Sequence, residues 1–332
     1  MTDLRRQLEL YGLDHSIRQA QVDGANEWQR RKGVNRVMTA HDIMSSLPEM
    51  EEMSFLHSGL AQTCLPHSKP SDDREAWIRS SGKFKLIITP GAISDDDDDG
   101  KLRYVGVPYG SKARLIMIYL QTEGVKGRTV SLGPNLSSFL RSLGLRTVSG
   151  GKNGSITSVR AQCMRIARCQ FTMQWSGNDA SGGRRNIVQD TKIVDGLELW
   201  TGRDGKEWAG TVELSERFQE HLREHAVPLD KRSLGLLADN SLALDLYTLF
   251  AYRLPRLAKP LHLRWEHLQA QIGTDYARER RLSEKVRMVM PDVWAAYPGA
   301  KVEVLPTGLT MYNSPPTVPE KTLVNGFRLV TG

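Results

Sequence analysis

The spacing of apolar residues between positions 107 and 194 predicts helices and strands in a fixed order. A helix, a strand and two further helices come first, and a hairpin follows. The ranges are 111–124, 128–133, 135–145 and 155–168 for these four elements, and 169–175 with 185–194 for the hairpin. In the second helix Leu136, Phe139, Leu140 and Leu143 recur on one face, and Gly144 marks the end.

The same order returns between positions 241 and 312. An apolar helix stopped by Pro255 precedes a strand, a short helix, a longer helix and a hairpin with Thr307–Gly308 at its tip. The ranges are 241–254, 260–265, 265–273, 276–290 and 300–312. Pro291 is expected to kink or end the longer helix. We interpret the shared order as a duplicated architecture.

Helix, strand, helix, helix and hairpin is the order of a winged helix, whose third helix fits the DNA major groove. The fold class we predict is α+β, with tandem winged-helix domains and an additional N-terminal, mainly helical segment. The predicted domains are 1–75, an acidic helical region with its linker; 76–225, the first winged helix with added strands; 226–316, the second; and 317–332, a tail. Between the copies we expect another hairpin at 196–215, a helix capped by Ser215, and a hinge at 226–233.

The two third helices have one apolar and one polar face. In the second copy the inward stripe is Leu282, Val286, Val289 and Val293, and the outward residues are Arg280, Arg281, Glu284 and Arg287, with Lys285 on the flank. Arginine can read guanine with two parallel hydrogen bonds, and Glu284 can accept from cytosine or pair with a neighbouring arginine. In the first copy the stripe is Ile156, Val159, Cys163 and Ile166, and the outward residues are Thr157, Ser158, Ala161, Arg165 and Arg168. A solvated helix with salt bridges is the alternative interpretation of the charged face.

The loop before the first of these helices reads GGKNGS, at 150–155. It is not a P-loop, because the lysine precedes the last glycine instead of following it, and it lacks the dinucleotide pattern. A helix N-terminus with small hydroxyl residues suits contact with DNA phosphates. A plain turn without a ligand is the other interpretation.

The charge of the chain is +7 and is unevenly distributed. Residues 1–100 hold 12 basic and 17 acidic side chains, whereas 101–332 hold 33 and 21. This indicates a polyanionic partner for the basic part. Three cysteines predict a reducing compartment without a disulfide framework, and no apolar run approaches membrane-spanning length, so we expect a cytoplasmic protein.

Other groups of potentially functional residues give weaker evidence for a site. His57, Cys64 and His67 offer three metal ligands but no fourth, and surface histidines near a linker are the preferred interpretation. The aspartate run at 94–100 is expected to be a solvated loop. Tryptophans 175, 200, 208 and 265 are expected to pack in strands or the core, with stacking on single-stranded bases as the alternative. No catalytic signature is found, so we predict no enzyme, no cofactor and no metal.

Three motifs occur in order: PYGS at 108–111, GSIT at 154–157 and SLALDLY at 241–247. With the segments 132–145, 226–254 and 297–316, they make the chain resemble plasmid-encoded RepA-type replication initiators over roughly 107–316. Pro291 departs from the family pattern, in which this helix is continuous.

The resemblance implies a non-enzymatic initiator that binds origin repeats, opens neighbouring A·T-rich duplex and represses its own promoter. It implies dimers at the operator, active monomers at the origin, and contact with the host replication initiator and replicative helicase. The expected DNA-binding residues are Lys152, Ser155, Thr157, Ser158, Arg160, Arg165, Arg168, Arg184, Arg185, Arg278, Arg280, Arg281, Glu284, Lys285, Arg287 and Lys301. A winged-helix repressor without a replication role, and a primase or nuclease with an unrecognised site, are the competing hypotheses.

Overall fold

The computed structural model describes residues 4–94, 101–144, 154–178, 184–201, 207–273 and 279–319. The protein is of mixed α+β type and divides into two compact units. Unit 1 combines Met1–Ser54 with Val227–Gln269 and Asp275–Phe327, and unit 2 consists mainly of Phe55–Ala226. The boundary at 226–227 lies in the segment predicted as a hinge, but this segment is strand β11 (Ala226–Asp230), of which residues 227–230 are buried.

Unit 2 contains the first copy of the predicted order, which we call the first module. Its elements are α4 (Gly110–Lys126), β6 (Thr129–Ser131), α5 (Leu136–Ser142), α6 (Ser155–Arg168), β9 (Val194–Thr201) and β10 (Glu207–Leu214). The three helices were expected from the sequence, and their apolar faces are buried, with Phe139, Leu140 and Val159 at most 1% exposed. The strands form a three-stranded sheet in the order β6-β10-β9.

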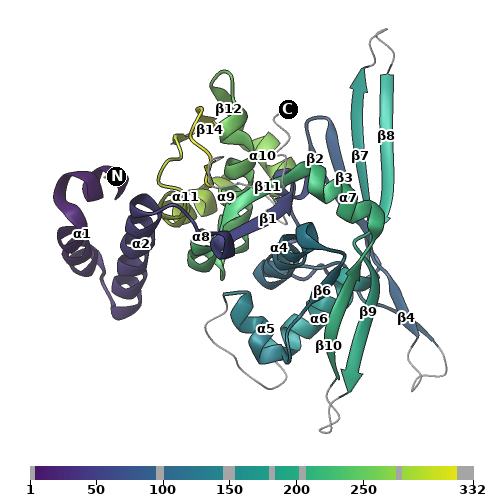
Figure 1. Ribbon diagram of the computed structural model, residues 1–332. Coiled ribbons are helices and arrows are strands. Elements are labelled where there is room, and N and C mark those ends of the chain that lie inside the picture. The colour runs from purple at the N-terminus through teal and green to yellow at the C-terminus, as the bar shows by residue number, and fades with distance from the viewer. Residues whose placement is uncertain are drawn as a thin grey trace. The chain divides into compact units, whose positions relative to one another are not determined.

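The hairpin of this module is not the one that we predicted. Strands β7 (Gln170–Asn178) and β8 (Arg184–Lys192) do form the expected hairpin, but β7 pairs with β3 (Phe84–Thr89), which pairs with β2 (Trp77–Ser81). The strand β6 instead pairs with β10, with Val212 opposite Val130. Figure 1 shows the hairpins β7–β8 and β9–β10 extending to opposite ends of unit 2. The hairpin next to the helices is therefore β9–β10, and β7–β8 is an insertion.

Unit 1 contains the second copy, which we call the second module. Its elements are α9 (Ser241–Arg253), β12 (Leu261–Arg264), α10 (Trp265–Ile272), α11 (Glu279–Ala296), β13 (Val302–Leu305) and β14 (Gly308–Met311), with the sheet order β12-β14-β13. The pairing of Leu305 with Gly308 places Pro306 and Thr307 at the hairpin tip, one residue earlier than predicted. A side chain at position 308 would collide with the carbonyl oxygen of Leu263 on the neighbouring strand, which explains the glycine.

Helix α11 does not end before Pro291 but continues to Ala296. The residues after the proline belong to the core, since Val293, Ala295 and Ala296 are at most 1% exposed. Burial of this apolar turn compensates for the backbone hydrogen bond that proline cannot donate.

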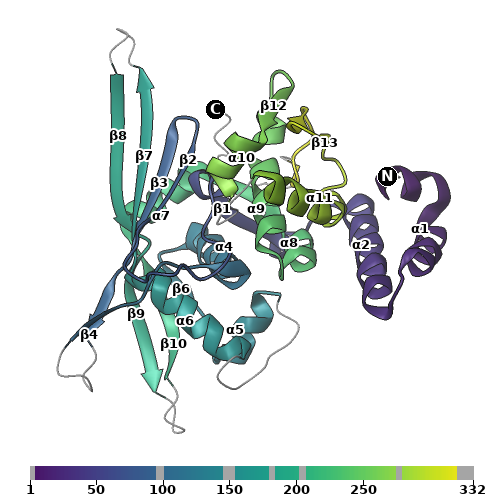
Figure 2. The same cartoon turned by 180° about the vertical axis from the view of Figure 1, so that it is seen from behind.

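The N-terminal helices belong to unit 1. Helices α1 (Leu4–Asp23) and α2 (Glu27–Ser45) pack against each other, and α2 also packs against α11 and against α8 (Lys231–Leu237). Figures 1 and 2 show α2 beside α11 from both sides. Leu8, Val37 and Ala40 form a small core with Ala295 of α11. The sequence predicted these helices but not what they pack against.

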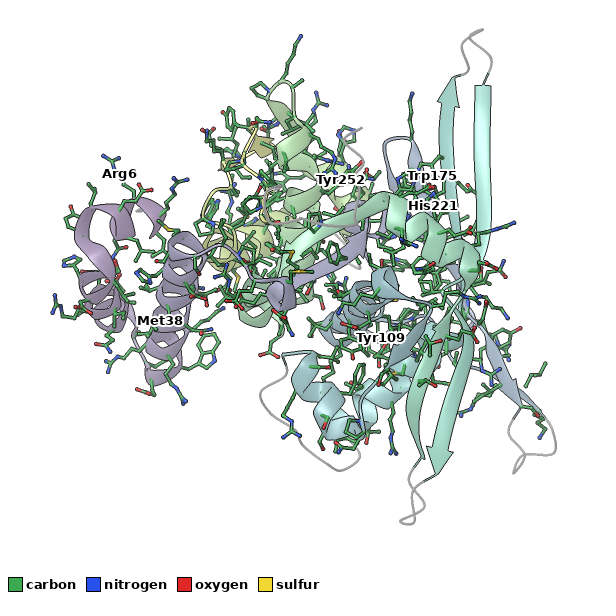
Figure 3. The ribbon with its side chains drawn as sticks, in the orientation of Figure 1. Arg6, Met38, Tyr109, Trp175, His221 and Tyr252 are labelled. Atoms are coloured by element: carbon green, nitrogen blue, oxygen red, sulfur yellow. The ribbon has the colours of Figure 1, made fainter. Side chains whose placement is uncertain are left out.

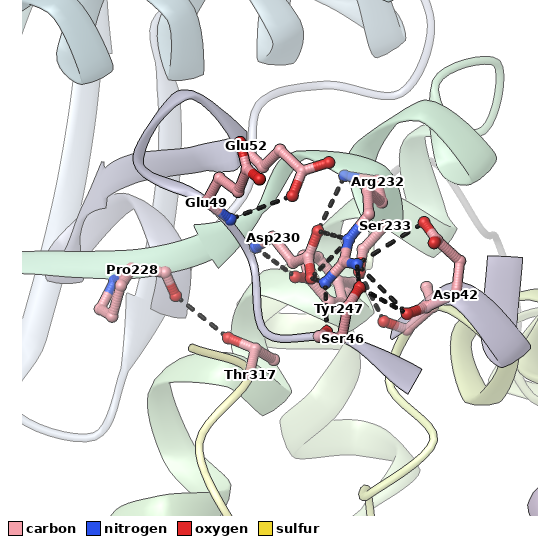
Figure 4. Close-up of polar contacts among 11 residues, drawn as sticks. Asp42, Ser46, Glu49, Glu52, Pro228, Asp230, Arg232, Ser233, Tyr247 and Thr317 are labelled. Carbon is pink, nitrogen blue, oxygen red and sulfur yellow. Dashed lines mark hydrogen bonds and ion pairs between the residues drawn. The ribbon is translucent and has the colours of Figure 1, made fainter. Parts of the chain in front are cut away.

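Arg232 joins α2 to α8 (Figure 4). Its guanidinium is ion-paired with the buried Asp230 at 2.8 Å, and it donates hydrogen bonds to Ser46 Oγ at 2.9 Å and to the carbonyl oxygen of Asp42 at 3.2 Å. The carbonyl oxygen of Asp42 also accepts the backbone N–H of Ser46 at the C-cap, so Arg232 is an additional donor there. Arg232 also donates to the carbonyl oxygen of Ser46, just beyond the end of α2, at 3.2 Å.

The remaining elements of the described chain complete the two units. They are η1 (Met50–Glu52), β1 (Met53–His57), α3 (Ser58–Gln62), the antiparallel pair β4 (Ala92–Ser94) and β5 (Leu102–Tyr104), α7 (Glu216–His225) and η2 (Leu254–Arg256). Ser215 caps α7 as predicted, because its hydroxyl accepts a hydrogen bond from the backbone N–H of Phe218.

His57 is fully buried in unit 2, so its interpretation as a surface histidine is wrong. Its Nδ1 accepts a hydrogen bond from the N–H of Gly59 at 3.0 Å, so the proton of the neutral ring lies on Nε2. This Nε2 lies 2.7 Å from Nδ1 of His221 and donates to it. Figure 3 shows His221 beside Trp175. Both nitrogen atoms of His57 are therefore occupied, and it does not act as a metal ligand with Cys64 and His67.

This histidine pair predicts that the protein loses stability as the pH falls. Burial, with neighbouring His221 and His225, lowers the pKa of His57, and burial and His225 lower the pKa of His221 to about 4. Between about pH 6.5 and pH 4 the unfolded chain binds protons that the folded chain excludes, so stability decreases as the pH falls through this window. His221→Asn should flatten this dependence in thermal unfolding followed by circular dichroism. The exposed His267→Gln is the matched control, and an equal flattening in both variants would contradict the assignment.

Arg232→Ala should destabilise unit 1. It leaves the Asp230 carboxylate, whose side chain is 1% exposed, without its partner, and this costs about 3 kcal/mol or more of unfolding free energy. Urea denaturation measures the loss, and the exposed neighbour Lys231→Ala should stay close to wild type. A loss in Arg232→Ala no larger than in the control would show that the anchor does not stabilise the unit.

Candidate nucleic-acid interface

Helix α11 has the two faces that the sequence predicts. Leu282, Val286 and Val293 are fully buried, and Val289 is 8% exposed. The opposite face is exposed and carries the charged residues Arg280, Arg281, Glu284, Lys285 and Arg287. A rigid helix with a buried stripe on one side thus presents its charges to solvent on the other.

The charged residues of α11 have different roles. Arg280 donates a hydrogen bond from Nε to Glu284 at 3.0 Å, and both side chains are more than half exposed. Such a surface pair contributes only about 0.3–0.5 kcal/mol, so a ligand can displace it at little cost. Arg281 and Lys285 are exposed on the same face.

Arg287 contacts the hairpin instead of solvent alone. Its guanidinium donates hydrogen bonds to the carbonyl oxygens of Leu305 at 2.9 Å and Val304 at 3.4 Å. Trp265 holds the tip of the same hairpin, since its ring N–H donates to Pro306 O at 2.7 Å. Arg287 therefore fixes the hairpin beside the helix. This contact could not be predicted from the sequence. A helical wheel gives the direction of a side chain but does not show which carbonyl groups of other elements lie near it.

Helix α6 presents a smaller and less charged surface. Thr157 and Arg168 are exposed, whereas Ser158, Arg160 and Arg165 are half-buried. Arg165 donates to its own helix at Ala161 O and lies over the ring of Tyr109, at 5.0 Å. Val159 and Ile166 form the buried stripe as predicted, with Ile156 and Cys163 at its half-buried edges. Burial raises the pKa of the Cys163 thiol to about 12, so it is an unreactive packing residue.

The remaining predicted residues are distributed over other parts of the chain. Lys152 and Arg278 lie outside the described residues. Ser155 begins α6, after Gly154 at the N-cap. Arg184 and Arg185 are on β8, opposite Asn178 and Gly177 at the end of the inserted hairpin, and the four-stranded sheet does not bring them to α6. Lys301 is exposed just before β13. It therefore lies at the open end of the hairpin β13–β14, opposite the tip at Pro306 and Thr307.

Two buried polar residues hold the first module together and were not singled out in the sequence. Gln162 of α6 accepts a hydrogen bond from the backbone N–H of Tyr109, which precedes α4. Arg114 of α4, only 5% exposed, donates to the carbonyl oxygens of Leu65 and Pro66. The segment around PYGS is therefore a structural joint that fixes α6 to α4. The sequence did contain an indication of this role, because Gln162 and Arg114 are polar residues within largely apolar helices.

No helix among the described ranges has the length and apolar character that a bilayer-spanning helix requires.

Comparison with known proteins gave a family match and several similar structures, among them two crystal structures of RctB domains. Residues 107–266 match the family model described as plasmid encoded RepA protein. A crystal structure of domains 2 and 3 of RctB has a TM-score of 0.47 and 12% sequence identity, and covers 77% of this chain and 98% of that chain. A second crystal structure of RctB domains 2-3 has a TM-score of 0.42 and 12% identity, and covers 76% and 94%. No curated protein matches the sequence.

Arg287→Ala should loosen the hairpin β13–β14 while leaving the core of the second module intact. The variant loses two charge-assisted hydrogen bonds to carbonyl groups at the tip. We expect several-fold faster hydrogen exchange of the amides near Leu305 and Gly308, measured by mass spectrometry, and unchanged exchange in α9. Arg281→Ala is the control, because its side chain lies on the same helix face, and exchange that is equally fast in both variants would contradict the role of Arg287.

Proposed function

We propose that the chain, whose residues 107–266 match the family model described as plasmid encoded RepA protein, is a replication initiator that binds double-stranded DNA through two winged helices. In this proposal α6 and α11 are the helices that enter the major groove. The hairpins β9–β10 and β13–β14 are the wings that lie along the DNA backbone. The proposed domains keep the boundaries predicted from the sequence, except that residues 1–54 group with the second module and residues 55–75 with the first.

The observation that carries the proposal is the exposed charged face of α11 beside a fixed hairpin. An α-helix fills the major groove, and only its outward residues reach the base edges. Arg281 can donate two parallel hydrogen bonds to a guanine, and Lys285 can contact a neighbouring base or phosphate. Glu284 can accept from cytosine after its surface pair with Arg280 opens. Arg287 acts through the wing.

The first module is proposed to bind mainly through the DNA backbone. Its helix begins at Ser155 after a glycine N-cap, so the positive end of the helix dipole is available to an anion, and Thr157 is exposed in the first turn. Lys152 lies three residues before this helix in the sequence and is proposed to contact phosphate. Two modules on one chain raise the affinity for adjacent sites, because binding of the first increases the local concentration of the second.

The biological role follows from the family and is part of the proposal. We propose that monomers occupy origin repeats and that dimers repress the promoter of the gene. Opening of A·T-rich duplex and contact with the host initiator and replicative helicase complete the proposed role. A repressor without a replication function would use the same α11 face, and tandem repeats next to the coding region would favour the initiator.

Arg281→Ala should weaken binding to the specific repeat more than binding to random DNA. Loss of a bidentate base contact costs about 1–3 kcal/mol, or roughly tenfold or more in affinity, for the specific site only. Lys301→Ala should weaken both by a similar, smaller factor, because a phosphate contact carries no sequence information. Footprinting on the upstream region of the gene identifies the repeat, and gel-shift titration at fixed salt measures both affinities.

Two results would contradict the proposal. Equal losses on specific and random DNA in Arg281→Ala would show that α11 does not read bases. Metal-dependent cleavage or primer synthesis by the purified protein, unchanged by substitutions on α11, would favour the enzyme hypothesis.

A further inference from the structure

A groove of about 1000 Å³ lies within unit 1, next to the second module. Helices α1 and α2 form one wall, and α11 and β13 form the other. Three aromatic residues line it: Trp28 of α2, Trp294 of α11 and Tyr312, which follows β14. None of these aromatic side chains has a role in the proposed duplex contact.

The aromatic residue at the mouth of the groove is accessible. Trp28 is 67% exposed, and the amine of Lys32 lies over its ring at 5.3 Å from the centroid. A flat ring with a cation next to it can stack on a base while the cation contacts the adjoining phosphate.

The charged side chains along the groove are mostly basic. The lining contains Arg5, Lys32, Arg36 and Lys301 against Asp23 and Glu303. Asp292 of α11, whose side chain is 6% exposed, binds both Lys32, at 2.7 Å, and Arg36. This buried carboxylate fixes the two cations on the wall of the groove, so that they are ordered before a ligand arrives.

The groove is continuous with the face of α11 that is proposed to read duplex DNA. Met288 lines the groove and is 65% exposed. It lies one turn after Glu284 and two turns after Arg281 on the same helix face. A strand separated from a duplex bound at Arg281 would therefore reach the groove within a short distance.

We propose that this groove binds a short stretch of single-stranded DNA. Stacking platforms combined with cations along a groove are the chemistry of single-strand binding, whereas the bases of a duplex are already stacked on each other. The groove is suited to hold one strand of opened duplex next to the site that anchors the protein. This inference rests on the proposed duplex binding by α11, because that binding brings DNA to the groove.

The test compares single-stranded and duplex binding in the full-length protein. Fluorescence anisotropy with a labelled fifteen-residue oligo-dT and with the labelled duplex repeat gives both affinities. Trp28→Ala should weaken oligo-dT binding about fivefold or more, since one stacking contact is lost, and should leave duplex binding unchanged. Trp28→Phe should restore most of the loss. Tyr11→Ala is the matched control, because Tyr11 is 60% exposed in the same helix pair but does not line the groove.

Arg281→Ala separates the failure of this inference from the failure of the proposed function. It should weaken duplex binding and leave oligo-dT binding unchanged. Oligo-dT binding that is the same in Trp28→Ala and wild type would overturn the groove as the site. If the groove instead holds a segment of another protein, oligo-dT will bind neither wild type nor variants, while duplex binding persists, and the inference is overturned. Duplex binding that stays at the wild-type level in Arg281→Ala, together with weakened oligo-dT binding in Trp28→Ala, would support the groove and overturn only the duplex assignment.

Discussion

Burial of the apolar stripe on α11 is the constraint on which the second module depends. Leu282, Val286 and Val293 are fully buried, and this fixes the rotation of the helix about its axis. Because side chains project at 100° intervals, fixing the stripe also fixes Arg281 and Lys285 toward solvent. The hairpin then takes its position from the helix, through the contacts of Arg287 with the carbonyl groups of β13. The arrangement that we propose for DNA binding thus follows from packing that involves no ligand.

Local apolar spacing was sufficient to predict most elements but not their pairing. Helices α4, α5, α6 and α9 follow from periodicity and from terminal residues such as Asn135 and Gly144, which are signals within a few residues. Strands β7 and β10 both lie in plausible hairpins, and nothing local shows that β6 pairs with the second. Strand partners are set by contacts between residues far apart in sequence, so the sequence predicts β7–β8 as the hairpin of the first module, where the structure has β9–β10.

The sequence predicted which side chains of the candidate site face solvent, but not which groups they contact. Exposure of Arg280, Arg281 and Lys285 follows from the wheel, whereas the role of Arg287 depends on a hairpin that ends 24 residues later, at Met311. The contacts that hold the N-terminal helices also join residues far apart in the sequence. They involve Asp292 and Arg232, which as charged residues would be expected on the surface. Both are instead largely buried and hold partners on α2. Polar residues with distant partners carry no periodic signal, and this is why the packing of α1 and α2 could not be anticipated.

The two halves of helix α11 contribute to two different surfaces, the face proposed to bind duplex DNA and the wall of the groove. Up to Met288 its outer side is exposed and faces the proposed duplex, and beyond that point it is enclosed by α2 and the core of unit 1. Pro291 lies in the second half, where it lines the groove, and the helix continues through it because the following turn is buried. A displacement of the exposed half by DNA would be transmitted along a packed helix to Asp292 and so to Lys32 and Arg36. The two cations on the wall of the groove are therefore attached to the same rigid element as Arg281, so the position of the groove is fixed relative to the helix face that is proposed to bind duplex DNA.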